Sequence, residues 1–273
     1  MLANKALAER ARYRQSCGVT SAQGARAKIA RALELLLQLD DELHNYLDAD
    51  PIRLQQEIQP DGETLVIALR VTDPAPLNLG LLVGEIAHQM RSALDHLAYA
   101  LVLAAGNTPT RRTAFPVLTT RPAGGLRIEG GVSPAAMAAV EEFQPYQRTD
   151  AAAHPLHRLT ELWNIDKHRH LHLTALFATG TQVFISMPDG SAMVGGQLQT
   201  TAVGDDGVLG VFRFEGGEIH PDLEVTASGS NFIALGDQGP WPHDQPVQLL
   251  LEELHQYVAQ VVLPRVEGLL RTS

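Results

Sequence analysis

The sequence contains little cysteine, few aromatic residues and no long apolar run. Its single cysteine, Cys17, cannot form a disulfide within the chain, which indicates a reducing compartment. The opening residues MLANKALAERARYRQ lack the apolar core of a signal peptide, and no apolar stretch reaches the roughly 20 residues of a membrane span. We therefore expect a cytoplasmic protein without membrane contact.

Positive charge and nucleotide-binding motifs are also scarce. The 273 residues carry a formal net charge of −10 and no block of Lys and Arg, which excludes a broad nucleic-acid-binding surface. A small site for RNA needs only local positive charge and is compatible with a negative net charge. No Walker, Rossmann or G-x-S-x-G pattern occurs, so we expect no cofactor and no serine-hydrolase chemistry. Hydrophobic residues make up 45% of the chain, which is enough for a globular core.

Hydrophobic periodicity predicts an α+β fold that is mainly α. Helices are expected at about 2–15, 21–47, 77–106, 133–143, 155–170 and 246–270, with Pro264 kinking the last one. Two strand-like runs at 51–72, separated by Pro60-Asp61-Gly62, predict a β-hairpin. Runs rich in Val, Thr, Ile and Phe at 171–238 predict a small antiparallel insertion, with turns at the glycine pairs 195–196 and 216–217.

This order of elements predicts a single domain. Residues 1–170 would form a helical bundle with the hairpin, residues 171–238 the β insertion, and residues 239–273 a last helix that returns to the bundle. The apolar side of the last helix, which includes Val258, Val261 and Val262, needs partners that the earlier helices can supply. The helix at 21–47 offers Leu33 and Leu37, among others. We therefore expect a discontinuous bundle of about five helices.

The helix expected at 77–106 has two contrasting faces. At about 100° per residue, one side is apolar; it consists of Leu79, Val83, Ile86, Met90, Leu94, Leu97 and Leu101. The opposite side, within roughly 100° of arc, carries His88, Arg91, Ser92, Asp95 and Tyr99, with His96 just beside it. A polar stripe is also typical of any solvated helix, and Arg91 with Asp95 is a common helix-supporting pair.

Arg91 and His96 form an R-x4-H pattern suited to metal-free RNA cleavage. His96 would move a proton to or from the 2′-hydroxyl or the leaving oxygen, Arg91 would hold the phosphate, and Asp95 would orient a base or balance Arg91. In a helical bundle this pattern resembles the signature of HEPN-domain proteins, many of which are RNases of toxin–antitoxin and defence systems. The resemblance implies a homodimer, in which two motifs form one site for RNA.

A wider resemblance covers about a third of the chain. The order RSALDHLAYAL, FPV at Phe115, QPY at Gln144 and NIDKHRHL at Asn164 is similar to a bacterial family of helical proteins that has no established activity. This resemblance implies that the polar residues of two helices belong together. The residues expected to support the site or to contact phosphate are His88, Tyr99, Asn164, Asp166, Lys167, His168 and Arg169. The last four residues have an alternative interpretation. They would lie at the C-terminus of a helix, where positively charged side chains stabilise the helix dipole.

Two other functions are compatible with the same residues. In the first, the RSALDH and DKHR residues form a buried structural network inside a non-catalytic binding or interaction module, because buried charges must be paired. In the second, the E-x-x-H pairs Glu85/His88 and Glu252/His255 contribute to a metal site in the bundle; the alternating His168, His170 and His172 are a further route to a metal. A catalytic pair should be open to solvent, whereas a structural network should be closed.

Overall fold

A computed structural model describes residues 22–177, 182–188, 192–197, 201–202, 207–214, 219–228, 231–236, 239–242 and 244–271. The chain forms two compact units. Unit 1 comprises the residues up to Leu37, Val83–Arg169 and the residues from Leu251 onward, and unit 2 comprises Gln38–Leu82 and His170–Leu250. The helix expected at 2–15 and Cys17 lie outside the described residues.

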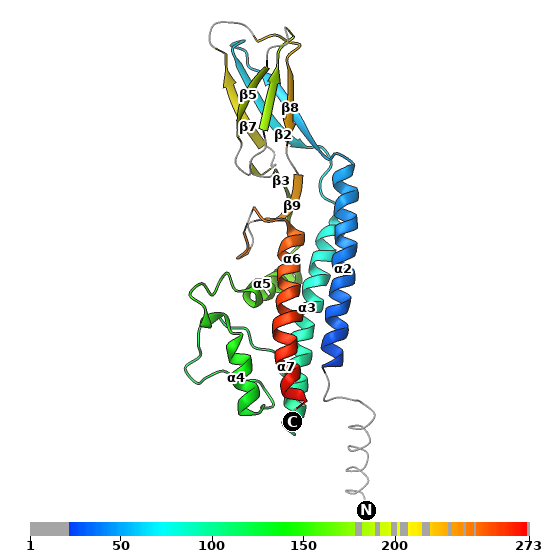
Figure 1. Ribbon diagram of the computed structural model, residues 1–273, viewed down its shortest axis with the longest axis vertical. Coiled ribbons are helices and arrows are strands. Elements are labelled where there is room, and N and C mark those ends of the chain that lie inside the picture. The colour runs from blue at the N-terminus through cyan, green and yellow to red at the C-terminus, as the bar shows by residue number, and fades with distance from the viewer. Residues whose placement is uncertain are drawn as a thin grey trace, which may run out of the picture. The chain divides into compact units, whose positions relative to one another are not determined.

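The described helices confirm the mainly α character of the predicted α+β fold (Figure 1). Ser133 caps one of them by accepting a hydrogen bond from the Ala136 N–H, with proline in the first turn, as the Ser-Pro pair predicts. No described helix is both long and apolar enough to cross a membrane. The helices are α2 (Gln23–Asp48), α3 (Leu77–Ala104), α4 (Pro134–Glu142), the 3-10 turn η1 (Pro145–Gln147), α5 (Pro155–His168), α6 (Val247–Gln256), the π-helical η2 (Tyr257–Val262) and α7 (Leu263–Leu270).

The C-terminal helix runs past Pro264 through a π-helical segment. The N–H of Leu263 bonds to the carbonyl of Val258, five residues earlier. Because proline lacks an N–H and its ring crowds the preceding turn, a wider turn lets the helix continue without a break. The wider turn also changes the phase of the helix. Val258 and Val262 are buried, whereas Val261 is 45% exposed, so its predicted place on the apolar side was wrong.

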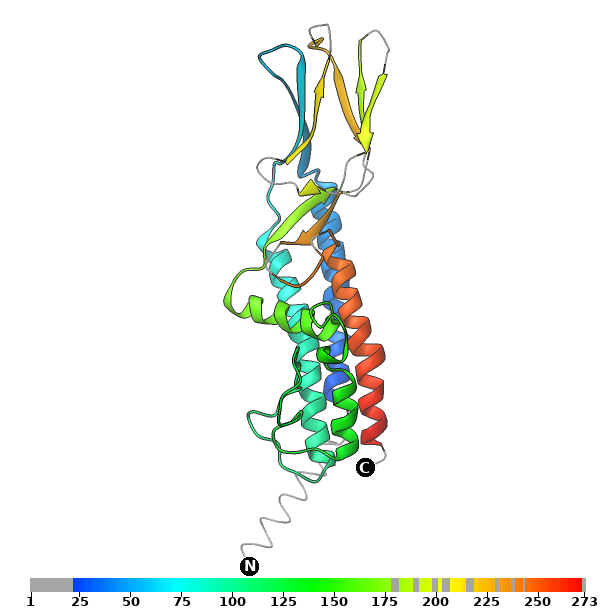
Figure 2. The same cartoon turned by 90° about the vertical axis from the view of Figure 1, so that its left-hand side faces the viewer.

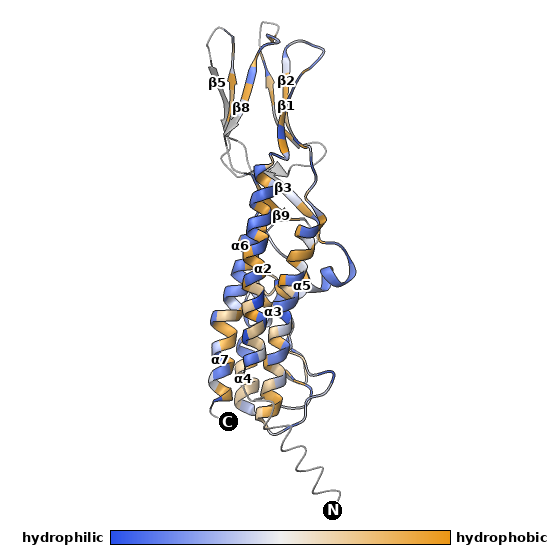
Figure 3. Ribbon diagram, turned by 90° about the vertical axis from the view of Figure 1, so that its right-hand side faces the viewer, coloured by the Kyte–Doolittle hydropathy of each residue, from blue (hydrophilic) through white to orange (hydrophobic). Residues whose placement is uncertain are grey.

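The apolar face of α3 lies in the core, as its periodicity predicts. All seven apolar positions expected on this helix are at most 2% exposed. Helix α5 packs crosswise on α3 and buries Leu156, Leu159 and Leu162 (Figure 2). On α2, hydrophilic and hydrophobic bands alternate (Figure 3), but Leu33 and Leu37 are 47% and 63% exposed, against expectation.

Unit 2 contains the predicted hairpin and the predicted antiparallel strands. In the part of the chain that the structure describes, they form three three-stranded sheets with the orders β1-β2-β7, β6-β3-β9 and β5-β4-β8. Because β2 pairs with β7, the hairpin and the insertion share one sheet, which the sequence did not indicate. The strands are β1 (Ile52–Ile58), β2 (Thr64–Val71), β3 (Leu173–Phe177), β4 (Gln182–Ser186), β5 (Ala192–Gln197), β6 (Thr201–Ala202), β7 (Gly207–Arg213), β8 (Glu224–Ser228) and β9 (Asn231–Leu235).

Local turn chemistry explains the hairpin between β1 and β2. The carboxylate of Asp61 accepts hydrogen bonds from the N–H groups of Glu63 and Thr64, and Gly62 has a φ of 70°, a left-handed conformation that favours glycine. The predicted turn at residues 195–196 was wrong. Gly195 lies within β5 opposite Val183, at a register shift where a strand glycine suits a β-bulge. The pair at 216–217 lies outside the described residues.

Candidate functional site

Arg91 and Asp95 of α3 both form hydrogen bonds with the backbone of one residue, Phe115. Arg91 Nη2 donates to the carbonyl of Phe115 at 2.9 Å, and Asp95 Oδ1 accepts the N–H of Phe115 at 2.9 Å. The two side chains lie one helical turn apart, with Arg91 Nη1 2.9 Å from Asp95 Oδ1. The i,i+4 pair therefore holds both polar backbone groups of Phe115, whose ring is itself buried.

The guanidinium of Arg91 is enclosed. Arg91 is only 7% exposed, and its Cζ lies 5.5 Å from the ring centroid of Trp163 on α5, within cation–π range. Burial lowers the pKa of Arg91, and the charge of Asp95 opposes this shift. Nε and Nη1 make no hydrogen bond to the part of the chain that the structure describes. Nη1 is thus held to Asp95 by charge rather than by hydrogen-bond geometry.

A second set of side-chain hydrogen bonds, made by Gln144, holds the residues after Phe115. The sequence did not indicate this role of Gln144. Gln144 is completely buried; its Nε2 donates to the carbonyls of Pro116 at 2.8 Å and Val140 at 3.1 Å. Its Oε1 accepts the N–H of Leu118 at 3.0 Å. We call residues 115–118 the FPV strap. The joint occurrence of FPV and QPY in the sequence was the only signal that Gln144 and this strap belong together.

Helices α3 and α5 also meet at a polar seam formed by Glu85, His88, Trp163, Asp166 and Lys167. Trp163 Nε1 donates weakly to His88 Nδ1 at 3.4 Å, and Lys167 Nζ lies 2.9 Å from the ring centroid. Burial raises the pKa of Asp166, an effect that Glu85 reinforces and His88 opposes. Helices α3 and α5 therefore contact each other through Trp163, His88 and Asp166.

Gly84 lets the carboxyl group of Asp166 approach α3 closely. A Cβ at position 84 would lie 2.1 Å from Asp166 Oδ1 and 2.4 Å from its Cγ. We expect Gly84→Ala to lower the free energy of unfolding by about 1–2 kcal/mol, because overpacking outweighs the better helix propensity of alanine. Chemical denaturation would measure this change.

Gly268 in α7 provides the control for that substitution. A Cβ at this position meets no other atom within 4 Å. Gly268→Ala should therefore raise stability by about 0.5–1 kcal/mol through propensity alone. Equal stabilisation by Gly84→Ala would mean that Asp166 moves aside without cost and that the seam is not closely packed.

His96 does not join Arg91. It is exposed and lies against Gly24 of α2, where an added Cβ would come within 2.3 Å of its Nδ1. Five residues along a helix correspond to a rotation of roughly 140° between side chains, and Arg91 instead contacts Asp95, Phe115 and Trp163. Within one chain, the two residues of the R-x4-H pattern thus contact different elements.

The other predicted site residues are mostly open to solvent. Tyr99 is 47% exposed. Asn164, His168 and Arg169 are exposed, and the Arg169 N–H caps the end of α5 by bonding to the Ile165 carbonyl. These residues therefore do not form part of the enclosure around Arg91.

The structure does not bring the two E-x-x-H pairs together as a metal site. His255 Nε2 lies 3.2 Å from the Ile29 carbonyl on α2, whereas His88 contacts Trp163 on α5. Among the described residues, no group of three or more His, Cys, Asp or Glu side chains is arranged to hold a metal ion. This includes the alternating His168, His170 and His172.

His154 is a buried titratable group that the sequence analysis missed. It is 4% exposed and caps α5, with Nδ1 accepting the Leu156 N–H at 3.2 Å. Because Nδ1 accepts, the neutral ring carries its proton on Nε2, which lies 3.2 Å from the hydroxyl of Tyr257. Burial, with the nearby charges of Arg148 and His157, lowers the pKa of His154 to about 4.

This pKa predicts an acid-dependent loss of stability. The unfolded chain, with a histidine pKa of about 6.5, takes up the proton before the folded chain does as pH falls. The contribution of His154 is complete above about pH 6.5 and declines toward pH 4, by about 3 kcal/mol in total. Denaturation at a series of pH values should reveal this slope for the wild type. His154→Asn keeps a capping acceptor and should flatten the slope; an unchanged slope would assign it to other groups.

No protein-family model matches the chain, no curated protein matches it, and no solved structure matches it.

Proposed function

We propose that this chain is a non-catalytic binding protein in which the RSALDH, FPV and QPY segments are an internal scaffold. The observation that supports this most strongly is the enclosure of Arg91, which is 7% exposed and bonded to the Phe115 carbonyl. A phosphate-binding arginine must offer its donors to a ligand. Here a ligand would have to displace the FPV strap, leaving a buried carbonyl without its donor, at a cost of about 1–3 kcal/mol.

The polar seam fits the same proposal. Trp163 is approached by two cations, Arg91 and Lys167, and its N–H points to His88. Cation–π contacts and a partly buried carboxyl group, Asp166, join α5 to α3. These interactions explain why charged residues recur on both motif helices without requiring a reaction.

The alternative function is a HEPN-like, metal-independent ribonuclease. The observation that favours it is the exposure of His88 and His96 on α3, where either imidazole is open to solvent. Because Arg91 is enclosed, a homodimer would have to place His96 beside a different arginine. Otherwise, Arg91 would have to leave its contact with Phe115.

An assay for RNA cleavage in excess EDTA tests the proposal. Wild type, Arg91→Ala and His96→Ala would be compared after each has been checked for folding by thermal melting. We expect no cleavage by the wild type, a lower melting temperature for Arg91→Ala and little change for His96→Ala, because His96 is exposed. Cleavage by the wild type that is lost in both well-folded variants would reject the proposal and establish the ribonuclease.

A further inference from the structure

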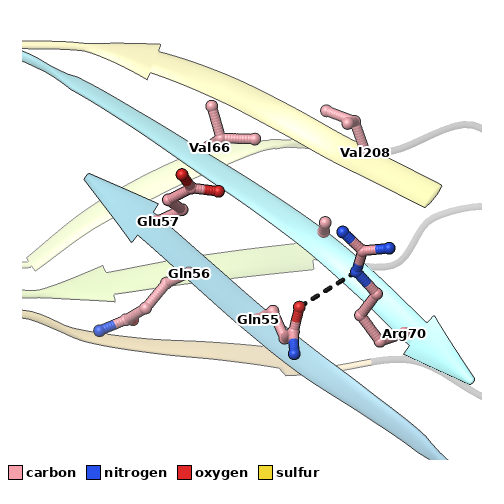
Figure 4. Close-up of a pocket in the computed structure, with 7 residues that line it drawn as sticks. Gln55, Gln56, Glu57, Val66, Arg70 and Val208 are labelled. Carbon is pink, nitrogen blue, oxygen red and sulfur yellow. Dashed lines mark hydrogen bonds between the residues drawn. The ribbon is translucent and has the colours of Figure 1, made fainter. Parts of the chain in front are cut away.

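Unit 2 carries a hollow of about 430 Å³ on one face of the sheet β1-β2-β7 (Figure 4). Its size lies in the lower range of small-ligand sites. Three small apolar side chains form its floor, and amide, carboxylate and guanidinium groups surround them. The lining residues are Gln55, Gln56, Glu57, Val66, Ala68, Arg70 and Val208. Gln56 pairs with Ile67 and points away from the other side chains, and its Nε2 donates to the Leu223 carbonyl (Figure 4).

The strand register explains this arrangement. Gln55 pairs with Ala68, Glu57 pairs with Val66, and Ala68 pairs with Val208, so these side chains share one face of the sheet. Leu65 and Ile67 alternate onto the opposite face and are fully buried. The lined face is therefore the solvent side, and the apolar Val208 is 44% exposed there.

Arg70 fixes the orientation of Gln55. Its Nε donates to Gln55 Oε1 at 3.1 Å, as Figure 4 shows. Since the amide oxygen is the acceptor in this bond, the Gln55 NH₂ group is the part of the amide that can donate to a ligand carbonyl. Arg70 is in this sense a positioning residue for the hollow.

Glu57 supplies a negative charge at the end of the floor away from the guanidinium of Arg70. Its side chain is exposed and lies two residues from Gln55 on the same strand, which corresponds to about 6.6 Å. A carboxylate accepts from cations, and the net charge of −10 favours a positively charged ligand at longer range. None of the seven lining residues is aromatic, so the hollow offers no ring on which a base or sugar could stack.

We propose that this hollow binds the amino-terminal end of an aliphatic peptide segment. The ammonium group would contact Glu57, the first two side chains would cover Val66, Ala68 and Val208, and the second carbonyl would accept from Gln55. In an extended peptide the ammonium nitrogen and the second carbonyl are separated by about two residue rises, roughly 6.6 Å, which matches the spacing of Glu57 and Gln55. This inference rests on the proposed binding function and names its ligand class.

An NMR titration of the full chain with two dipeptides tests this inference. The probes are Val-Val amide, which has a free ammonium group, and N-acetyl-Val-Val amide, which does not. We expect shifts at Val66, Ala68 and Val208, and about 1.5-fold to fivefold tighter binding of the free amine, the range for an exposed ion pair. Glu57→Gln should remove that preference.

Glu224→Gln is the matched control, because Glu224 is an exposed strand glutamate of β8 outside the hollow. It should leave the preference for the free amine intact. Absence of shifts at about 10 mM peptide, where even a millimolar complex would form, overturns the inference, and so does equal binding of both peptides. RNA cleavage in the EDTA assay would reject the proposed function separately, whereas no cleavage and no peptide binding would reject this inference alone.

Discussion

Replacing Arg91 by alanine is expected to lower the free energy of unfolding of unit 1 by about 3 kcal/mol. The substitution removes the donor to the Phe115 carbonyl, the ion pair with Asp95 and the contact with Trp163. Breaking a buried ion pair from one side costs about 3–5 kcal/mol. We place the effect at the lower end because the Asp95 side chain is 33% exposed and can regain water.

Chemical denaturation and thermal melting would measure this loss. Arg121→Ala is the matched control, because Arg121 also forms an ion pair at 2.9 Å, with Glu141, but its side chain is 69% exposed. That variant should stay within about 0.5 kcal/mol of the wild type. If the two arginine variants proved equally stable, the enclosure of Arg91 would not contribute to the fold, and the scaffold interpretation would fail.

Replacing Gln144 by alanine should have a comparable effect, about 3 kcal/mol. Gln144 is fully buried and its amide makes three hydrogen bonds, to the backbone of Pro116, Leu118 and Val140. Truncation leaves these backbone groups without their partner, and each buried unpaired group costs about 1–3 kcal/mol. We take a value below the sum because water can enter the space that the side chain leaves.

Gln147 offers a control three residues away. It is exposed, and its Nε2 makes a single hydrogen bond at 3.3 Å to the carbonyl of Glu141. Gln147→Ala should change stability by less than about 0.5 kcal/mol. Hydrogen exchange at Leu118 gives a more local measurement, since its N–H should exchange faster in Gln144→Ala alone. Unchanged protection of the Leu118 N–H would contradict its hydrogen bond to Gln144.

These two predictions concern the same strap. Arg91 and Asp95 hold its first residue from α3, and Gln144 holds the following residues from the end of α4. The motifs RSALDH, FPV and QPY thus meet around residues 115–118. Their fixed order in the sequence has a structural explanation that requires no reaction.

Local rules determined much of the fold in advance. The 3.6-residue period placed all seven apolar residues of α3 correctly in the core, because a helix face must be buried as a whole. The Asp61-Gly62 turn was equally predictable, because its hydrogen bonds lie within four residues. The exposure of Leu33, Leu37 and Val261 was not, since it depends on which neighbours a helix meets and on the π-helical turn before Pro264.

The sequence by itself thus determined most of the described helices and strands, the mainly α fold and the residues that carry charge on the two motif helices. Only the tertiary structure decided what those charges do. An arginine on a polar stripe looks the same whether it faces water or a neighbouring backbone, and the FPV strap that encloses Arg91 lies 24 residues away in sequence. Because pairing at that distance leaves no local pattern, the contacts that Gln144 makes with residues 116–118 could not be read from the sequence. The separation of Arg91 from His96, by contrast, follows from the roughly 140° between residues five apart on a helix.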